Sequence, residues 1–297
     1  MPVFPRRAFI LGALLALSAC TPDGPGQQTA RSGGPPPAAA PHALDAYFNS
    51  QWAMDKLWED GLAEVATYAA ERVIYNKVRR FDYTQITVKE EFNQEFNVKT
   101  DSYQRSDMFP VLKVNQFCRI PTDQYPYHFL TSLFFRRDRP VALHKLTTSS
   151  QEWCGATFKA ITDEGDQYTE TYNSYWDKQG AGQRQLPHDV LFEDALPYTL
   201  RALRFEQKPA FAATILELQQ TSKATPPVSY QARVAVAEAA AAEAAEPAWQ
   251  VRVRLDQEKE NVYWFARRYP NVLLRQTTWD GRTLQLTSVR RYAYWTH

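Results

Sequence analysis

The sequence predicts a mainly β protein with some α-helix: a large curved antiparallel sheet, either a meander or a half-barrel, with an N-terminal helix packed on it. Runs rich in Val, Ile, Thr and Tyr recur along the chain, and these residues favour a half-buried pleated surface. The pair Asp280-Gly281 separates two such runs, and Asp-Gly is typical of a tight β-hairpin turn. Near the start of the predicted domain, large apolar residues recur at spacings of three and four, which indicates an amphipathic helix.

Composition and charge exclude several classes of protein. The 297 residues are 44% hydrophobic and 13% aromatic, which is enough to bury a core and is not typical of a disordered chain. Lys and Arg number 34 against 33 Asp and Glu, so the formal charge of +1 gives no reason to expect nucleic acid as a partner. Three cysteines without a CxxC pair exclude a disulfide scaffold and indicate no zinc site. We expect neither a metal nor a cofactor.

The first twenty residues predict a lipoprotein signal. Arg6 and Arg7 precede an apolar run over residues 8–19, which is the layout of a secretory signal and is too short to span a bilayer. The run ends in Leu-Ser-Ala-Cys20, which matches the lipobox of bacterial lipoproteins, where the cysteine thiol receives a diacylglyceryl group before cleavage. We therefore expect residues 1–19 to be removed and Cys20 to carry the lipid.

Residues 20–43 predict a flexible tether. They are rich in Gly, Pro and Ala, and such a segment cannot bury enough surface to offset its ordering entropy. Thr21, rather than Asp, follows the lipidated cysteine, which favours the outer membrane in enterobacterial sorting. We expect one β-rich domain over residues 44–297, held at the periplasmic face of the outer membrane by its lipid.

The elements of that domain are predicted in chain order. Residues 44–60 form the amphipathic helix, which Gly61 ends. Residues 63–78 mix helix-prone alanines with β-branched residues, and we interpret them as a strand. Residues 186–203 are expected to form two short helices separated by Pro197.

Two later segments complete the prediction. Residues 219–248 contain Pro226-Pro227 and an Ala/Glu run without large apolar residues, so we expect a solvated excursion from the domain. Residues 272–279 and 283–295 flank the Asp-Gly pair and are expected to form the closing hairpin.

The densest cluster of chemically active side chains runs from His144 to Gly155. As an active site, Cys154 would be the nucleophile, His144 its base and Glu152 the group that orients the base. The competing interpretation is structural: two strands meet at a turn, with Trp153 buried in the core and Cys154 facing a neighbouring strand. We favour the structural interpretation.

Cys118 and Cys154 are the cysteines that remain once Cys20 is acylated. Thiols exported to an oxidising compartment commonly pair, and the closed loop of ~37 residues would contribute roughly 3.5–4 kcal/mol in the chain-entropy model. Two unpaired cysteines on neighbouring strands are the competing interpretation. A disulfide would exclude Cys154 as a nucleophile.

Several motifs together resemble a family of uncharacterised bacterial lipoproteins, sometimes carried under the name septum formation inhibitor Maf. They cover roughly residues 52–180 and include the segments 58–68, 72–75, 86–91, 110–113, 125–127 and 147–155. The resemblance implies an exported β-rich lipoprotein and no particular activity. The family pattern, Glu152-Trp153-Cys154-Gly155, does not include Cys118, so the resemblance does not imply the disulfide.

Two functions from different classes follow. The first is a non-enzymatic envelope protein, anchored to the membrane through its N-terminal lipid, that binds a hydrophobic ligand or an envelope partner. The alternative is a periplasmic hydrolase that uses Cys154 with His144. The state of the Cys154 thiol discriminates between them.

Overall fold

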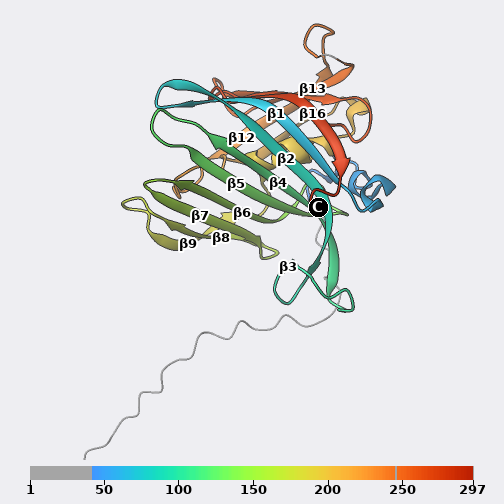
Figure 1. The fold of residues 1–297 in the computed structure, drawn as a ribbon. Coiled ribbons are helices and arrows are strands. Elements are labelled where there is room, and N and C mark those ends of the chain that lie inside the picture. Colours follow the sequence, from blue (N-terminus) through green and yellow to red (C-terminus); the bar gives the residue numbers. More distant parts are fainter. Residues whose placement is uncertain (1–41, 245, 297) are drawn as a thin grey trace, which may run out of the picture. The chain divides into compact units, whose positions relative to one another are not determined.

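A computed structural model describes residues 42–244 and 246–296, which belong to one compact unit. The unit is built on one curved sheet of sixteen strands and contains only short helical segments (Figure 1). The predicted β class and large curved antiparallel sheet are therefore confirmed. The predicted signal, Cys20 and most of the tether lie outside the described residues. No described helix is long and apolar enough to cross a bilayer.

The first half of the sheet is a meander that runs outward from a central strand. It comprises β1 (Ala63–Ile74), β2 (Lys77–Asn93), β3 (Val98–Lys99), β4 (Met108–Ile120), β5 (Tyr127–Arg136), β6 (Leu143–Glu152), β7 (Gly155–Asp163), β8 (Gln167–Ser174) and β9 (Ala181–Pro187). β3 pairs only with β2, and β9 forms one edge of the sheet. The strand predicted over residues 63–78 corresponds to β1 and the start of β2, joined at Tyr75-Asn76. Both turn residues have positive φ, as a tight hairpin turn requires.

The second half starts at the opposite edge and returns to the centre. Its strands are β10 (Leu191–Phe192), β11 (Ala210–Leu216), β12 (Ser229–Glu238), β13 (Ala248–Arg254), β14 (Glu260–Ala266), β15 (Leu273–Thr277) and β16 (Thr283–Tyr292). β16 pairs with β1 and joins the two halves. β15 and β16 form the hairpin predicted around Asp280-Gly281, where Gly281 supplies a φ of +80°.

A buried helical segment lies between β10 and β11. It contains 3₁₀ turns at Glu193–Ala195, Leu200–Ala202 and Phe205–Gln207 and one helical turn, α1 (Leu196–Thr199). Tyr198 stacks on Phe135 of β5, whereas Phe205 stacks on Trp249 of β13, so the segment packs against both halves. Pro197 lies in the first turn of α1 rather than between two helices, because its ring fits where no backbone N–H is needed. The prediction of two helices separated by Pro197 is therefore wrong.

The N-terminal helix predicted over residues 44–60 is also wrong. The structure has three separate 3₁₀ turns instead, at Asp45–Tyr47, Trp52–Met54 and Lys56–Glu59. The side chain of Asn49 accepts from the Gln51 N–H at 3.0 Å, and that of Asp55 accepts from the Leu57 N–H at 2.8 Å. Such local side-chain bonds compete with helical backbone bonds and interrupt the helix.

The solvated excursion predicted over residues 219–248 needs a larger correction. Residues 229–238 form β12, which pairs with β11 on one side and with β13 on the other. Alternate side chains of β12 are buried. Small and medium apolar residues at every second position are enough for a strand whose one face lies on the core. The described residues of the Ala/Glu run after β12 are exposed or half-buried and contain no helix.

Candidate functional site

A strap, residues 217–228 between β11 and β12, contacts the buried helical segment and β7 and helps line a candidate site. The Asp194 carboxylate accepts the backbone N–H groups of Gln219 and Gln220 at 2.7 and 2.9 Å. Further along the strap, Thr157 of β7 donates to the Ser222 carbonyl at 2.7 Å. The strap is therefore fixed at two places by buried side chains, although it belongs to no strand.

The strap and the neighbouring strand ends enclose a cavity of about 330 Å³, which we call the outer cavity. A volume of this size matches the smaller small-molecule sites of proteins. The lining residues from the strands and the β1–β2 turn are mostly apolar and aromatic, and those from the strap are mostly polar. The charged lining residues are Arg72, Lys159, Lys223 and Glu217, and the main apolar ones are Val73, Ile74, Tyr75, Tyr127 and Phe129. Three cations against one carboxylate give the lining a net positive charge.

Arg72, on β1, is half-buried and reaches into this cavity. Its guanidinium lies 5.2 Å from the centre of the Phe129 ring and donates two long hydrogen bonds, of 3.4 and 3.5 Å, to the Gln220 carbonyl. It forms no ion pair with a carboxylate in the part of the chain that the structure describes. Burial lowers the pKa of Arg72, and the nearby Arg282 adds to this effect. Its positive charge is only weakly compensated.

Lys159, on β7, is the second cation of the outer cavity and is only 1% exposed. Its ammonium contacts neutral oxygens: the Thr221 hydroxyl at 3.2 Å, the Lys223 carbonyl at 3.1 Å and the Gln219 amide at 3.4 Å. Among residues 42–244 and 246–296 it makes no ion pair with a carboxylate. Burial lowers the pKa of Lys159 to about 8, against the opposing attraction of carboxylates including Asp194.

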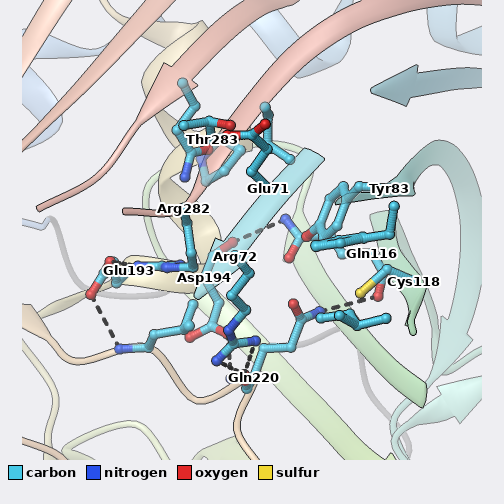
Figure 2. A pocket seen from close by; sticks show the side chains of 16 residues that line it. Glu71, Arg72, Tyr83, Gln116, Cys118, Glu193, Asp194, Gln220, Arg282 and Thr283 are labelled. Carbon is cyan, nitrogen blue, oxygen red and sulfur yellow. Dashed lines mark hydrogen bonds and ion pairs between the residues drawn. The ribbon is translucent and has the colours of Figure 1, made fainter. Parts of the chain in front are cut away.

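Figure 2 shows a smaller inner cavity, of about 40 Å³. Arg72 lines both this cavity and the outer one. The inner cavity has room for one or two water molecules. Its other cation, Arg282, is neutralised by a short contact to the Glu193 carboxylate and by Asp280 at 2.8 Å. Arg282 thus has two carboxylate partners, whereas Arg72 has none among the described residues.

Cys118 lines the inner cavity and is free. It is buried in β4, opposite Tyr83 on one neighbouring strand and Phe129 on the other, and this burial raises its pKa to about 12. Cys154 is exposed at the β6–β7 turn and is also free. The predicted disulfide is therefore not formed, because one thiol lies inside the sheet and the other lies on its rim.

The proposed catalytic pair is not brought together. His144 lies at the start of β6, where Nε2 is 2.7 Å from the Asn97 amide oxygen and the ring packs on Phe109. Cys154 follows the far end of the same strand, so about 30 Å of extended chain separates the two residues. Glu152 is the last residue of β6 and cannot orient His144 from there.

The core position predicted for Trp153 is wrong: its side chain is 79% exposed. Trp153 and Cys154 occupy the turn between β6 and β7, where strand alternation no longer applies. Trp153 stacks on Tyr125 at 5.9 Å, and the Cys154 thiol lies 3.5 Å from the Tyr125 hydroxyl. A side chain at Gly155 would collide with the Tyr175 ring, which explains the glycine.

Arg72, Lys159 and the strap were not predicted from the sequence. One signal was available: Thr157, Lys159 and Ile161 share one face of β7 by alternation, and Ile161 marks that face as the inner one. A lysine on the inner face of a strand is unusual enough to indicate a site. No group of three or more potential metal ligands among His, Cys, Asp and Glu occurs within residues 42–244 and 246–296.

Comparisons with known proteins add little to this geometry. No family model matches the chain, and no curated protein matches it. A solved structure from Brucella abortus, described as a β-barrel-like protein of the domain of unknown function DUF1849, is similar at 10% identity with a TM-score of 0.48. The match covers 78% of this chain and 98% of that one.

Proposed function

We propose that this protein is a binding protein that holds a small anion in the outer cavity. One observation supports this most directly: Arg72 and Lys159 both line the cavity, and neither forms an ion pair with a carboxylate in the described residues. A buried charge without a partner is unfavourable, and a carboxylate or phosphate between the two cations would relieve that cost.

We also propose that this binding protein works in the cell envelope, anchored by a lipid on Cys20. The lipobox and the composition of residues 20–43 support this location. Mass spectrometry of the membrane fraction should detect a diacylglyceryl group on an N-terminal Cys20, and Cys20→Ser should abolish it. A wild-type chain recovered as a soluble product cleaved at another residue would refute the anchor.

The alternative hydrolase has less support. It depends on Cys154 and His144, which lie at opposite ends of β6. The outer cavity contains neither of them. We therefore retain the binding function alone.

Calorimetric titration with acetate and with inorganic phosphate tests the proposal. We expect Arg72→Gln to weaken anion affinity about tenfold or more, because hydrogen bonds to charged groups contribute about 1.5–3 kcal/mol. Arg119→Gln is the matched control, since Arg119 is exposed and absent from the cavity lining. Wild-type protein that binds neither anion, or equal losses in the two variants, would contradict the proposal.

A further inference from the structure

The wall of the outer cavity continues outward as a series of aromatic rings. Phe129 and Tyr127 are successive inward-facing residues of β5, and their rings stack with centres 6.1 Å apart. The next ring is Tyr125, 5.8 Å from Tyr127, and the last is Trp153, 5.9 Å from Tyr125. We call these four residues the aromatic ladder.

The ladder joins the anion site to solvent. At its inner end the Arg72 guanidinium lies over Phe129, which is only 5% exposed. At its outer end Trp153 is 79% exposed, at the β6–β7 turn. Tyr75, from the β1–β2 turn, lines the cavity beside Tyr127, and the hydroxyls of these two residues share a short hydrogen bond. One face of the site therefore changes gradually from charged to apolar to exposed.

A ligand with a charged group at one end and an apolar part at the other would match this change along the site. An anion alone would use Arg72 and Lys159 and leave the outer rings of the ladder, Tyr125 and Trp153, in contact with water. Covering apolar surface is favourable in proportion to the area removed from water. An amphipathic anion would satisfy both ends, with its charged group at the cations and its hydrocarbon part along the rings.

We propose that the ligand is an amphipathic anion whose hydrocarbon chain lies along the aromatic ladder from Phe129 toward Trp153. This inference rests on the proposed anion site and specifies the ligand class. Ile74 and Val73, which also line the cavity, would contact the other side of the chain. The arrangement predicts that affinity depends on chain length at constant head group.

The test is a series of octanoate, dodecanoate and hexadecanoate, titrated below their micellar concentrations into the full-length chain carrying Cys20→Ser, so that no attached lipid competes. Each added methylene that becomes buried should raise affinity by about fourfold, from the usual 0.8 kcal/mol per methylene. Arg72→Gln should weaken all three carboxylates by a similar factor and leave the chain-length increments unchanged. Octanol, which lacks the charge, should bind much more weakly than octanoate.

Trp153→Ala provides the decisive variant. The side chain is exposed, so folding should be unaffected, while the increment from dodecanoate to hexadecanoate should fall by half or more. Trp295→Ala is the matched control, because Trp295 is 49% exposed and absent from the cavity lining.

The possible failures are distinguishable. Affinities that do not vary with chain length, with Arg72→Gln still harmful, would overturn the ladder inference and leave the anion site intact. An unchanged increment in Trp153→Ala would also overturn it. Failure of every carboxylate to bind would overturn the proposed function itself.

Discussion

Lys159 is a buried cation surrounded by neutral oxygens, and this environment lowers its pKa. Its pKa of about 8 is lowered from the ordinary value near 10.4 because burial disfavours the charged form. Asp194, Glu170 and Glu217 oppose the shift by attraction, whereas Arg184 reinforces it by repulsion. The side chain is thus charged below about pH 8 and loses its charge within a pH range that is easy to measure.

We predict that anion affinity falls as pH rises through 8, because the neutral amine no longer attracts an anion. The stability contribution of Lys159 changes in the opposite direction. Between pH 8 and about 10.4 the unfolded chain binds more protons at this residue than the folded chain does. The contribution of Lys159 to the free energy of unfolding therefore increases as pH rises. Titrations and unfolding curves of wild type and Lys159→Met at pH 7 and 9.5 check both effects. A pH dependence that is the same in the two proteins would contradict the assignment.

The two described thiols should react differently. Cys154 is exposed, whereas Cys118 is buried and its pKa of about 12 leaves almost no thiolate at neutral pH. We expect a thiol reagent to modify Cys154 rapidly in the native Cys20→Ser chain and Cys118 only after unfolding. Unfolded, unreduced protein should yield two thiols, and a count of zero would restore the disulfide.

Residue-scale prediction from sequence did not identify Lys159, although the geometry of a regular strand was enough to do so, and it was wrong for Trp153 at a turn, where that geometry does not apply. Alternation within β7 places Lys159 on the inner face. Trp153 was assigned to the core on the size and apolarity of its ring, but it belongs to a turn. The convergence of Arg72 with Lys159 could not be predicted, because β1 and β7 approach the cavity only through the curvature of the whole sheet.

At the scale of elements, the strap is held by side chains rather than by a strand ladder. Asp194 is 2% exposed and accepts two backbone N–H groups of the strap. We predict that Asp194→Asn loosens it, since an amide offers only one acceptor oxygen. Amide hydrogens of Gln219 and Gln220 should exchange about tenfold faster or more, and unfolding should become easier by about 1–3 kcal/mol. Asp138→Asn, at an exposed ion pair, is the control. Unchanged exchange in Asp194→Asn would show that the strap has other anchors.

Elements with their own local signal were predicted correctly. The β15–β16 hairpin follows from Asp280-Gly281, whose turn conformation needs no distant contact. The helix over residues 44–60 was predicted from apolar spacing alone, and the local bonds of Asn49 and Asp55 override it. β12 was missed because its buried face is mostly alanine and valine, and only pairing with β11 and β13 makes it a strand.

At the scale of the molecule, one core joins the two halves of the sheet. Buried residues of β1, of β4 through β9 and of β10 through β16 belong to one contiguous hydrophobic cluster, which also includes the buried helical segment between β10 and β11. Neither half could expose its part of this cluster without a large loss of buried apolar area. The described unit should therefore unfold as a whole.

Tyr198 gives the sharpest test of this coupling. It is fully buried in α1 and contacts Phe135 in the first half and Trp52 near the N-terminus of the unit. Tyr198→Ala should destabilise the fold by about 3–5 kcal/mol, as expected for deletion of a large buried aromatic side chain. At about 2–4 °C per kcal/mol for a domain of this size, Tm should fall by roughly 10 °C. Far-ultraviolet circular dichroism and tryptophan fluorescence should still report one coincident transition in both proteins, because the halves share the core that the variant weakens. Two separated transitions in either protein would show that the halves fold independently.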